Sequence, residues 1–304
     1  MPYILLVLVV IIYAGNILIG KAINELAPFT ITFFRLLIAF IVVLPIGFRS
    51  AWRNRSLFWK YKKPFTIMSL TGVTFFNTFI YGALQFTSAS NVSVLETVIP
   101  VITIVLSAWI LKERLRVIQW FGVMLSIIGA LWVVLDGAIL ELATINWNIG
   151  DFIMIGAILS WAFYSVFVKQ YMHLFPPFAA LLVMTSISLV VLFPIMLTEW
   201  IFYGIPSIFE LEYVTSLLYL GVFPSLIALL LYNNAVHKLG ASTAAIFLNF
   251  LPVVTMVGAY FWLGESITLM QIVGALFVIV GVVITTQRNL LKKDKILAPF
   301  VKEQ

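Results

Sequence analysis

The chain has 304 residues, of which 63% are hydrophobic and only 10% are charged. An average soluble domain is about half apolar and about a quarter charged, so this composition excludes a soluble globular protein and indicates a polytopic membrane protein. The net charge of +6 does not indicate nucleic-acid binding, because the basic residues gather in particular loops. The absence of cysteine excludes a disulfide framework, a thiolate metal site and a thiol nucleophile, and no cofactor or metal is expected.

Ten apolar runs follow one another along the chain. A bilayer core about 30 Å thick needs roughly 20 apolar helical residues, and the runs near that length are 3–20, 28–48, 64–86, 89–111, 117–135, 150–168, 177–198, 213–236, 241–263 and 268–286. The first run is expected to be a retained span, because it lacks a basic leader and a cleavage site. The runs lack the alternation of a membrane barrel. The predicted fold class is therefore an all-α polytopic membrane protein with ten transmembrane helices.

The lysines and arginines predict the orientation of these spans. If the N-terminus lies in the cytoplasm, all but two of the 18 basic residues fall in cytoplasmic segments, as the positive-inside rule requires. The exceptions are Lys21, in an external loop, and Arg35, inside a span. Most acidic residues fall on the external side. We therefore expect a multi-pass plasma-membrane protein with both termini in the cytoplasm.

The second half of the sequence repeats the first. At an offset of 152 residues, identical pairs include Ala89/Ala241, Ser90/Ser242, Pro100/Pro252, Glu113/Glu265, Gln119/Gln271, Gly122/Gly274 and Gly129/Gly281. At an offset of 148, residues 13–28 lie over 161–176. The predicted organisation is a five-helix repeat at 3–135, an external acidic linker at 136–149, a second repeat at 150–286 and a basic cytoplasmic tail at 287–304. Because five is odd, the second repeat is inverted in the membrane, the geometry used for alternating access.

The repeated pattern resembles the EamA family of the drug/metabolite transporter superfamily. Each copy has an alanine-serine start, a mid-helix proline, a Lys-Glu or Gly-Glu pair and a glycine-bearing helix; the pairs are Lys112–Glu113 and Gly264–Glu265. Residues 13–16 read YAGN, without the tryptophan that members often carry there. The resemblance covers about residues 3–286. It implies a ten-helix carrier of small metabolites, with some known members exporting amino acids or related compounds and others moving nucleotide sugars or phosphorylated sugars.

Two ionisable residues lie inside predicted spans. Glu96 is a candidate proton carrier, because an acidic residue at a helix centre costs about 3 kcal/mol and desolvation favours its protonated form. The alternative is a neutral acid bonded to a neighbouring helix or locked in a structural pair. Arg35 lies at a similar depth and is a candidate ligand for an anionic solute group. Pairing with Glu96, or extension of the side chain to the membrane surface, would explain it equally well.

Polar and aromatic residues on other spans are candidates for a solute cavity. They are Tyr13 and Asn16, Asn77 and Tyr81, Trp161 and Tyr164, Asn233 and Asn234, and Asn249. Asn77 and Tyr81 are four residues apart and so share one helical face. Any one of these side chains could equally well form a hydrogen bond between helices. Together, however, they predict a polar cavity with aromatic walls.

The remaining repeated residues predict shape rather than binding. Pro100 and Pro252 are expected to bend their helices as hinges. Glu113 and Glu265 precede the fifth and tenth spans, where negative charge suits a helix N-terminus. The glycine pairs, spaced by seven residues, allow close helix packing, either within the molecule or between copies, so a homodimer remains open.

The leading hypothesis is a secondary active transporter that exports a small organic solute, with proton coupling as an option. The string GNILIGK at 15–21 is no phosphate loop, because Ala22 follows and no strand precedes it. An intramembrane enzyme is the first alternative, but both histidines fall in predicted loops and the spans lack a metal-binding or carboxylate-pair motif. A channel or sensor without a carrier cycle is the other.

Overall fold

The computed structural model describes residues 2–110, 117–134, 137, 148–239, 248 and 250–297. Within this part of the chain all regular structure is helical and strands are absent, as the apolar runs predict. Most of the expected linker at 136–149 and the last residues of the tail lie outside the described residues.

The helices follow one another along the chain without intervening sheet structure in the described residues. They are α1 (Pro2–Ala22), α2 (Pro28–Arg53), α3 (Arg55–Lys60), α4 (Lys62–Met68), η1 (Ser69–Phe75), α5 (Phe76–Leu84), α6 (Ala89–Glu96), α7 (Ile99–Ile110), α8 (Val117–Val134), α9 (Ile149–Tyr171), η3 (Met172–Leu174), α10 (Pro177–Tyr203), α11 (Leu211–Val222), η4 (Phe223–Ala228), α12 (Leu229–Leu239), α14 (Leu251–Gly258), η5 (Ala259–Leu263) and α15 (Leu269–Leu297). The segments η1, η4 and η5 are π-helical, and η3 is a single 3₁₀ turn.

Six helical stretches are long and apolar enough to cross a membrane. They are Ile4–Ala22, Pro28–Arg53, Lys62–Leu84, Ile149–Leu174, Pro177–Tyr203 and Leu211–Tyr232. Four shorter apolar helical stretches, Ala89–Thr103, Trp120–Gly129, Leu251–Leu263 and Leu269–Gly281, fall within the other predicted runs. The chain is therefore a multi-pass membrane protein, and its helices α2, α10 and α15 extend beyond the apolar runs that predicted them.

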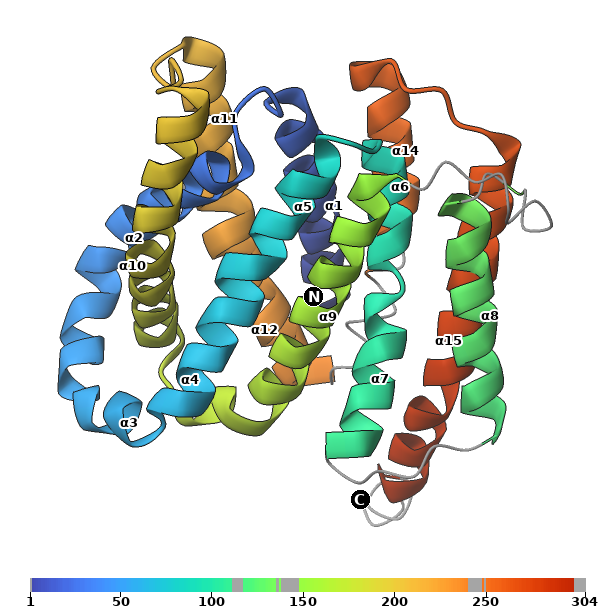
Figure 1. The fold of residues 1–304 in the computed structure, drawn as a ribbon. Helices are drawn as coiled ribbons and strands as arrows, with labels where there is room; N and C mark the ends of the chain where they lie inside the picture. Colours follow the sequence, from blue (N-terminus) through green and yellow to red (C-terminus); the bar gives the residue numbers. More distant parts are fainter. Residues whose placement is uncertain are drawn as a thin grey trace.

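The helices form one bundle, with α2 and α10 packed together on one side and α8 and α15 on the other (Figure 1). Helices α1, α5, α6, α9 and α14 lie between these pairs. We call the end where α2, α6 and α9 begin the upper end, and the end that carries α3 the lower end, as in Figure 1.

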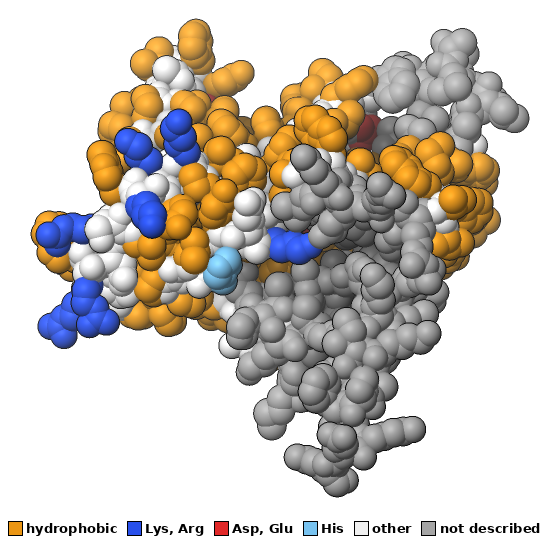
Figure 2. Space-filling model, turned by 90° about the horizontal axis from the view of Figure 1, so that it is seen from below, with side chains coloured by type: hydrophobic (Ala, Val, Ile, Leu, Met, Phe, Trp, Pro, Cys, Tyr) orange, Lys and Arg blue, Asp and Glu red, His pale blue; other side chains and the backbone are white. Residues whose placement is uncertain are grey.

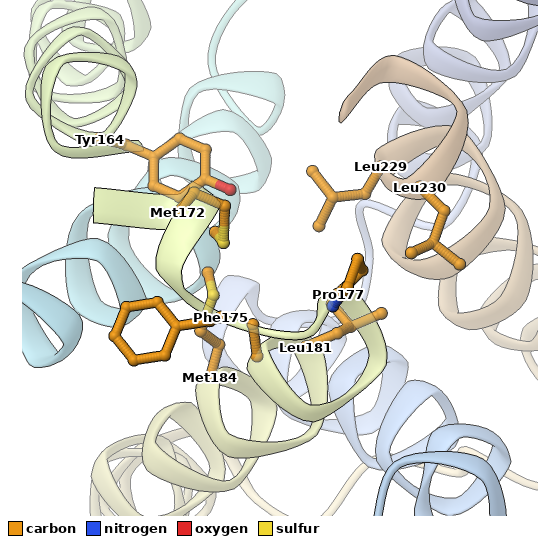
Figure 3. A pocket seen from close by; sticks show the side chains of 9 residues that line it. Tyr164, Met172, Phe175, Pro177, Leu181, Met184, Leu229 and Leu230 are labelled. Atoms are coloured by element: carbon orange, nitrogen blue, oxygen red, sulfur yellow. The ribbon is translucent and has the colours of Figure 1, made fainter. Parts of the chain in front are cut away.

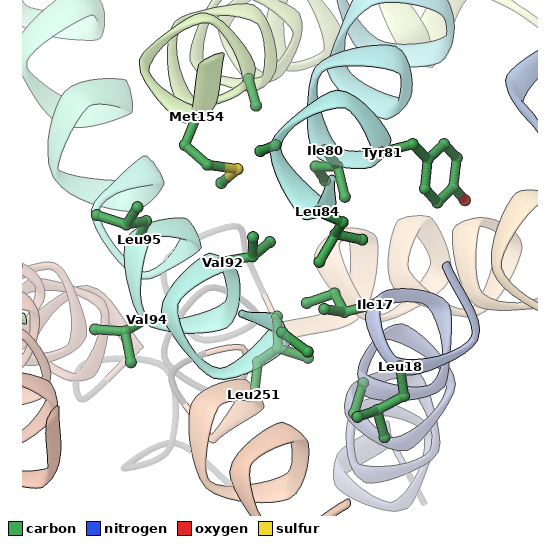
Figure 4. Packing of buried hydrophobic residues seen from close by; sticks show 14 of the residues in the cluster. Ile17, Leu18, Ile80, Tyr81, Leu84, Val92, Val94, Leu95, Met154 and Leu251 are labelled. Atoms are coloured by element: carbon green, nitrogen blue, oxygen red, sulfur yellow. The ribbon is translucent and has the colours of Figure 1, made fainter. Parts of the chain in front are cut away.

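The interior and the exterior of the bundle are both apolar. A buried cluster joins α1, α5, α6, α9 and α14, with Ile17, Ile80, Val92 and Met154 fully enclosed (Figure 4). Outward-facing side chains remain apolar as well; Val190 of α10 is 75% exposed. An apolar outer surface suits lipid rather than water as the surrounding solvent.

Basic side chains gather at the lower end. Arg49, Arg53, Arg55, Lys60, Lys62 and Lys63 are exposed on the last turns of α2, on α3 and on the start of α4. Viewed from below, they form a group of positive charges on one part of the surface (Figure 2). Exposed Trp52 and Trp59 lie in the same region, where Arg55 and Lys62 stack on their rings.

Helices α8 and α15 pack closely because of small residues at their contact. A Cβ atom added to Gly129 would lie 2.7 Å from the backbone nitrogen of Val278 and 2.9 Å from the carbonyl oxygen of Gly274. Backbone atoms cannot move aside as a flexible side chain can. The packing role predicted for the repeated glycines is thus confirmed at Gly129, and the contact lies within one molecule.

We expect Gly129→Ala to destabilise the protein although alanine is the better helix former. The added methyl group must push α8 and α15 apart, and overpacking of this kind costs about 1–3 kcal/mol. Gly82→Ala is the matched control, because a Cβ there would meet only Ile153 Cγ2 at an ordinary 3.6 Å and atoms still farther away. Thermal unfolding in detergent should show a lower midpoint for Gly129→Ala alone; equal midpoints for the two variants would contradict the close contact.

The two repeated prolines do not bend continuous helices as predicted. Pro100 is the second residue of α7, after a break at Thr97 and Val98, and Pro252 is the second residue of α14. Proline is tolerated in the first helical turn, where no intrahelical donor is needed. Both prolines lie in the first turn of a helix, while Pro45 and Pro194 lie inside the unbroken helices α2 and α10. The hinge role of Pro100 and Pro252 stays a prediction.

Candidate functional site

A buried arginine lies at the junction of four helical segments. The side chain of Arg35, on α2, is only 2% exposed. Its Nη1 donates to Asn16 Oδ1 of α1 and to Asn77 Oδ1 of α5, each at 2.9 Å, and to the hydroxyl oxygen of Tyr81. On the other side, Nε and Nη2 donate to Ser225 Oγ of η4 at 3.0 and 2.7 Å. The guanidinium group thereby joins α1, α2, α5 and η4.

The groups that bind Arg35 are held in place by bonds of their own. Tyr81 donates to Asn16 Oδ1 at 2.9 Å, and Asn77 Nδ2 donates to the Val73 carbonyl at 2.8 Å. Ser225 Oγ donates to the carbonyl of Leu220, five residues earlier, at 2.7 Å. The Tyr81 ring borders the apolar cluster while its hydroxyl points away from it (Figure 4). The predicted shared face of Asn77 and Tyr81 is confirmed, since both bind the same nitrogen.

The charge of Arg35 is surrounded by neutral acceptors only. None of its hydrogen-bond partners is a carboxylate, and no ion pair joins Arg35 to Glu96, both of which lie in the described part of the chain. The pair with Glu96, one of the alternatives considered for Arg35, is therefore not formed. A buried cation normally requires a counter-charge, because the desolvation penalty is several kcal/mol. The site thus presents a positive charge to which no carboxylate of the described residues is bound.

Two π-helical segments flank the arginine. Ser225 lies within η4, and Asn77 follows η1 by two residues. Single π turns interrupt the regular hydrogen bonding of an α-helix and often occur at functional sites. Segments η1 and η4 fall in the third and eighth predicted spans, and the other described π segment, η5, falls in the ninth.

Aromatic side chains extend the site from Arg35 towards the lower end. Tyr13 precedes Asn16 by three residues on α1, so the two side chains share one face of that helix. The rings of Trp161 and Tyr164, both on α9, lie in tilted contact with their centroids 5.0 Å apart. The structure therefore brings Tyr13, Asn16, Arg35, Asn77 and Tyr81 into one region.

An open crevice leads from the lower end to Tyr164. It is lined by Tyr164, Met172, Phe175, Pro177, Ala180, Leu181, Met184, Leu229 and Leu230. The lining is apolar except for the hydroxyl of Tyr164, which points into the space (Figure 3). That hydroxyl oxygen is buried without a hydrogen-bond partner. A buried polar group without a partner is uncommon.

Glu96 lies where the fourth predicted span is broken. It is the last residue of α6, and Thr97 and Val98 bond back to Val94 and Leu95 in a tight turn before α7 begins. Pro100 has no N–H with which to bond the Glu96 carbonyl four residues earlier. The side chain is partly buried, and no described residue donates a hydrogen bond to its carboxylate. Its neighbours Leu95 and Val98 belong to the same buried cluster as Tyr81, so Glu96 lies in the same part of the bundle as the arginine cluster.

The other predicted site residues have different outcomes. Asn234 is exposed, so its predicted inward orientation is wrong. The side chain of Asn233, and all of Asn249 and Glu113, lie outside what the structure describes. In the described residues, no group of three histidine, aspartate or glutamate side chains could hold a metal ion.

Glu265 caps a different helix from the one predicted. Its carboxylate accepts hydrogen bonds from the N-terminus of α6, at Ala89 N and Ser90 N. Helix α15 is capped instead by Thr268 and Gln271, whose side chains each accept from the other's backbone N–H. This reciprocal arrangement is a capping box.

Sequence reasoning missed three contributors to the site and its surroundings. Ser225 is a single serine in an apolar run, and Tyr232 is one of 11 tyrosines, so neither residue type nor spacing separates them from ordinary packing residues. Glu199 was assigned only to the external side. In the structure its carboxylate accepts from the N-terminus of α2, at Phe29 N and Thr30 N. The sequence at the start of α2, Pro28 to Thr32, gives no sign that a residue near position 199 binds its backbone.

A buried, charged and polar cluster inside a bundle with an apolar exterior is the arrangement of a membrane protein that handles polar solutes or ions. Sequence comparison agrees with this class. The chain belongs to the EamA-like transporter family, which matches residues 1–135 and 148–287. Members of this family are transporters and not enzymes, and the family resemblance inferred from the repeated motifs is confirmed.

Relatives from bacteria and archaea match this chain over most of their length. The chain is 27% identical to the uncharacterized transporter YyaM of Bacillus subtilis, over 72% of this chain and 71% of the relative. It is 27% identical to an uncharacterized transporter of Archaeoglobus fulgidus, over 94% and 98% of the two chains. One protein crystal structure superimposes with a TM-score of 0.62 at 16% identity, covering 94% of this chain and 97% of that one. At this identity the likeness supports the fold alone.

Proposed function

We propose that this transporter is a secondary carrier that exports a small organic solute, such as an amino acid or a related metabolite, by alternating access. The observation that carries the proposal is the Arg35 cluster, a buried cation bonded to neutral groups from four helical segments. Broken and π-helical segments surround it, and discontinuous helices are typical of carrier binding sites. A structural role alone would not require a cation at this position, because neutral side chains can join helices at lower desolvation cost.

The carrier is built from two inverted five-helix repeats with ten spans. Support comes from the separate family matches to the two halves, from the repeated residues, and from π segments in equivalent spans. The lower end, with its exposed arginines and lysines, faces the cytoplasm. Both termini then lie on the cytoplasmic side of the plasma membrane.

The solute binds between Arg35 and the aromatic wall. Tyr13, Asn16, Asn77, Tyr81, Trp161 and Tyr164 contribute polar and aromatic contacts, and Arg35 receives an anionic group such as a carboxylate. A guanidinium group binds a carboxylate through two parallel hydrogen bonds, for which Ser225 or Tyr81 would give way. Asn233 and Asn249 complete the site in this proposal. Glu96 carries the coupling proton, since its neighbours pack in the same buried cluster as Tyr81 and no described residue donates to its carboxylate.

Counterflow in liposomes tests the carrier proposal. Purified protein is reconstituted, the vesicles are loaded with one unlabelled compound, and uptake of its labelled form is followed for a panel of amino acids and organic acids, with and without a pH gradient. We expect saturable counterflow for a compound with a carboxylate, and none for the corresponding amide. Currents without counterflow would indicate a channel, and accelerated uptake of the amide would contradict the anion site.

A further inference from the structure

Helix α6 connects the upper end of the bundle to the site. It has only eight residues, and all of them from Ala89 to Leu95 except Asn91 are buried. Its first turn lies at the upper end, and its last residue is Glu96. A displacement of this short helix would therefore displace Glu96, since helix α7 begins separately after the turn at Thr97 and Val98.

The carboxylate of Glu265 holds the first turn of α6. Its two oxygens accept from Ala89 N at 2.8 Å, from Ser90 N at 3.2 Å and from Ser90 Oγ at 2.8 Å. Glu265 belongs to the connection between η5 and α15, so these bonds join segments 175 residues apart. Gln271 of α15 adds a second tie by donating to Asn91 Oδ1 at 2.7 Å. Because α15 has its own capping box, the Glu265 carboxylate is free for this contact.

Glu199 provides a comparison inside the same molecule. It accepts from Phe29 N at 3.1 Å, and from Thr30 N and Thr30 Oγ1 at 2.8 Å each. The chemistry is the same, but the helix differs. Helix α2 continues without a break for 26 residues and packs along α10. If its cap is lost, the packing against α10 still holds the rest of the helix in place. Helix α6 ends after eight residues.

We propose that Glu265 is a positioning residue that keeps the upper end closed by holding α6, and that release of this contact moves α6 as a unit together with Glu96. The inference rests on the proposed carrier function, in which the site must open to the upper end in part of the cycle. Lys21 holds the turn between α5 and α6, because its Nζ donates to the carbonyls of Leu84 and Thr87 at 2.7 and 2.9 Å. Unlike the Lys21 contacts, the Glu265 contact is made with α6 itself, as is the bond from Gln271 to Asn91.

Cysteine labelling tests the movement of α6. The chain has no cysteine, so a single introduced thiol is the only reactive one. Val92→Cys reports on the first turn of α6 and Thr97→Cys on the residue after Glu96; both positions are buried, at 0% and 3% exposure. Each is combined with Glu265→Gln, Glu265→Asp or Glu199→Gln in nanodiscs, and the rate of reaction with a water-soluble maleimide is measured.

We expect Glu265→Gln to accelerate labelling at both positions by at least about tenfold, equivalent to about 1.4 kcal/mol. Glu265→Asp keeps the charge and should restore part of the protection, and Glu199→Gln should leave both rates unchanged. Acceleration at Val92→Cys alone would overturn the proposal, because it would mean local fraying of the first turn. Equal effects of Glu265→Gln and Glu199→Gln, or no acceleration, would overturn it as well.

A milder variant covers the case in which Glu265→Gln does not fold. Ser90→Ala removes one of the three bonds, and a smaller acceleration at both labelled positions is expected; protection equal to the parent protein would overturn the proposal. Labelling needs no solute. Failure of counterflow would therefore contradict the carrier function, whereas failure of the labelling pattern would contradict only the role of Glu265.

Discussion

Replacing Arg35 with glutamine is expected to abolish solute binding and transport. Removal of one partner from a buried charge pair costs about 2–5 kcal/mol, which corresponds to a loss of affinity of roughly 30-fold to several thousand-fold. The variant also leaves Asn16, Asn77, Tyr81 and Ser225 without their shared donor, so thermal stability should fall. Solute-induced thermal stabilisation and counterflow, measured on the same preparation, check the two effects.

Two controls separate binding from folding at Arg35. Arg35→Lys keeps the charge but lacks the planar group that reaches Ser225 on one side and Asn16 on the other, so it should retain weak binding with reduced stability. Ser225→Ala removes one acceptor and leaves the charge in place, and it should bind the solute better than Arg35→Gln at comparable stability. If folded Arg35→Gln binds the solute as the parent protein does, the arginine is structural and the anion site is wrong.

Replacing Glu96 with glutamine is expected to remove the effect of a pH gradient on transport. Glutamine resembles the protonated acid in shape but cannot release a proton. In the parent protein, acid on the upper side should drive solute export, because protons that enter through Glu96 are exchanged for solute that leaves. In Glu96→Gln this stimulation should disappear, while exchange between labelled and unlabelled solute at equal pH continues. Flux assays in vesicles with and without the gradient measure both quantities.

Asp151 supplies the matched control for Glu96. It lies in the first turn of α9 at the upper end, and one of its buried oxygens has no hydrogen-bond partner. Asp151→Asn makes the same acid-to-amide change away from the arginine cluster, and gradient stimulation should persist. If the pH gradient still stimulates transport in Glu96→Gln but not in Asp151→Asn, the proton carrier is Asp151, and the role proposed for Glu96 is contradicted.

The candidate site could be predicted in part. Asn16, Arg35, Asn77 and Tyr81 stand out in sequence because polar residues in long apolar runs are costly and therefore noticeable. Their mutual hydrogen bonds were not predictable, and the most plausible pair by depth, Arg35 with Glu96, does not form. Depth along a helix fixes height in the membrane, whereas pairing also depends on how each helix is rotated and on which neighbours it contacts.

Sequence alone determined the membrane class, the positions of the apolar runs and the repetition of motifs along the chain. These properties depend only on residues that are near one another in the sequence. About 20 consecutive apolar residues can form a span whichever helices pack against it, and the repeated motifs are visible in the order of residues. The tertiary structure decided that Ser225 binds Arg35 from 190 residues away, that Glu265 caps α6 rather than α15, and that the fourth span breaks after Glu96. Each of these results depends on which distant helix comes into contact, and buried polar groups take the partners that packing places within hydrogen-bond distance.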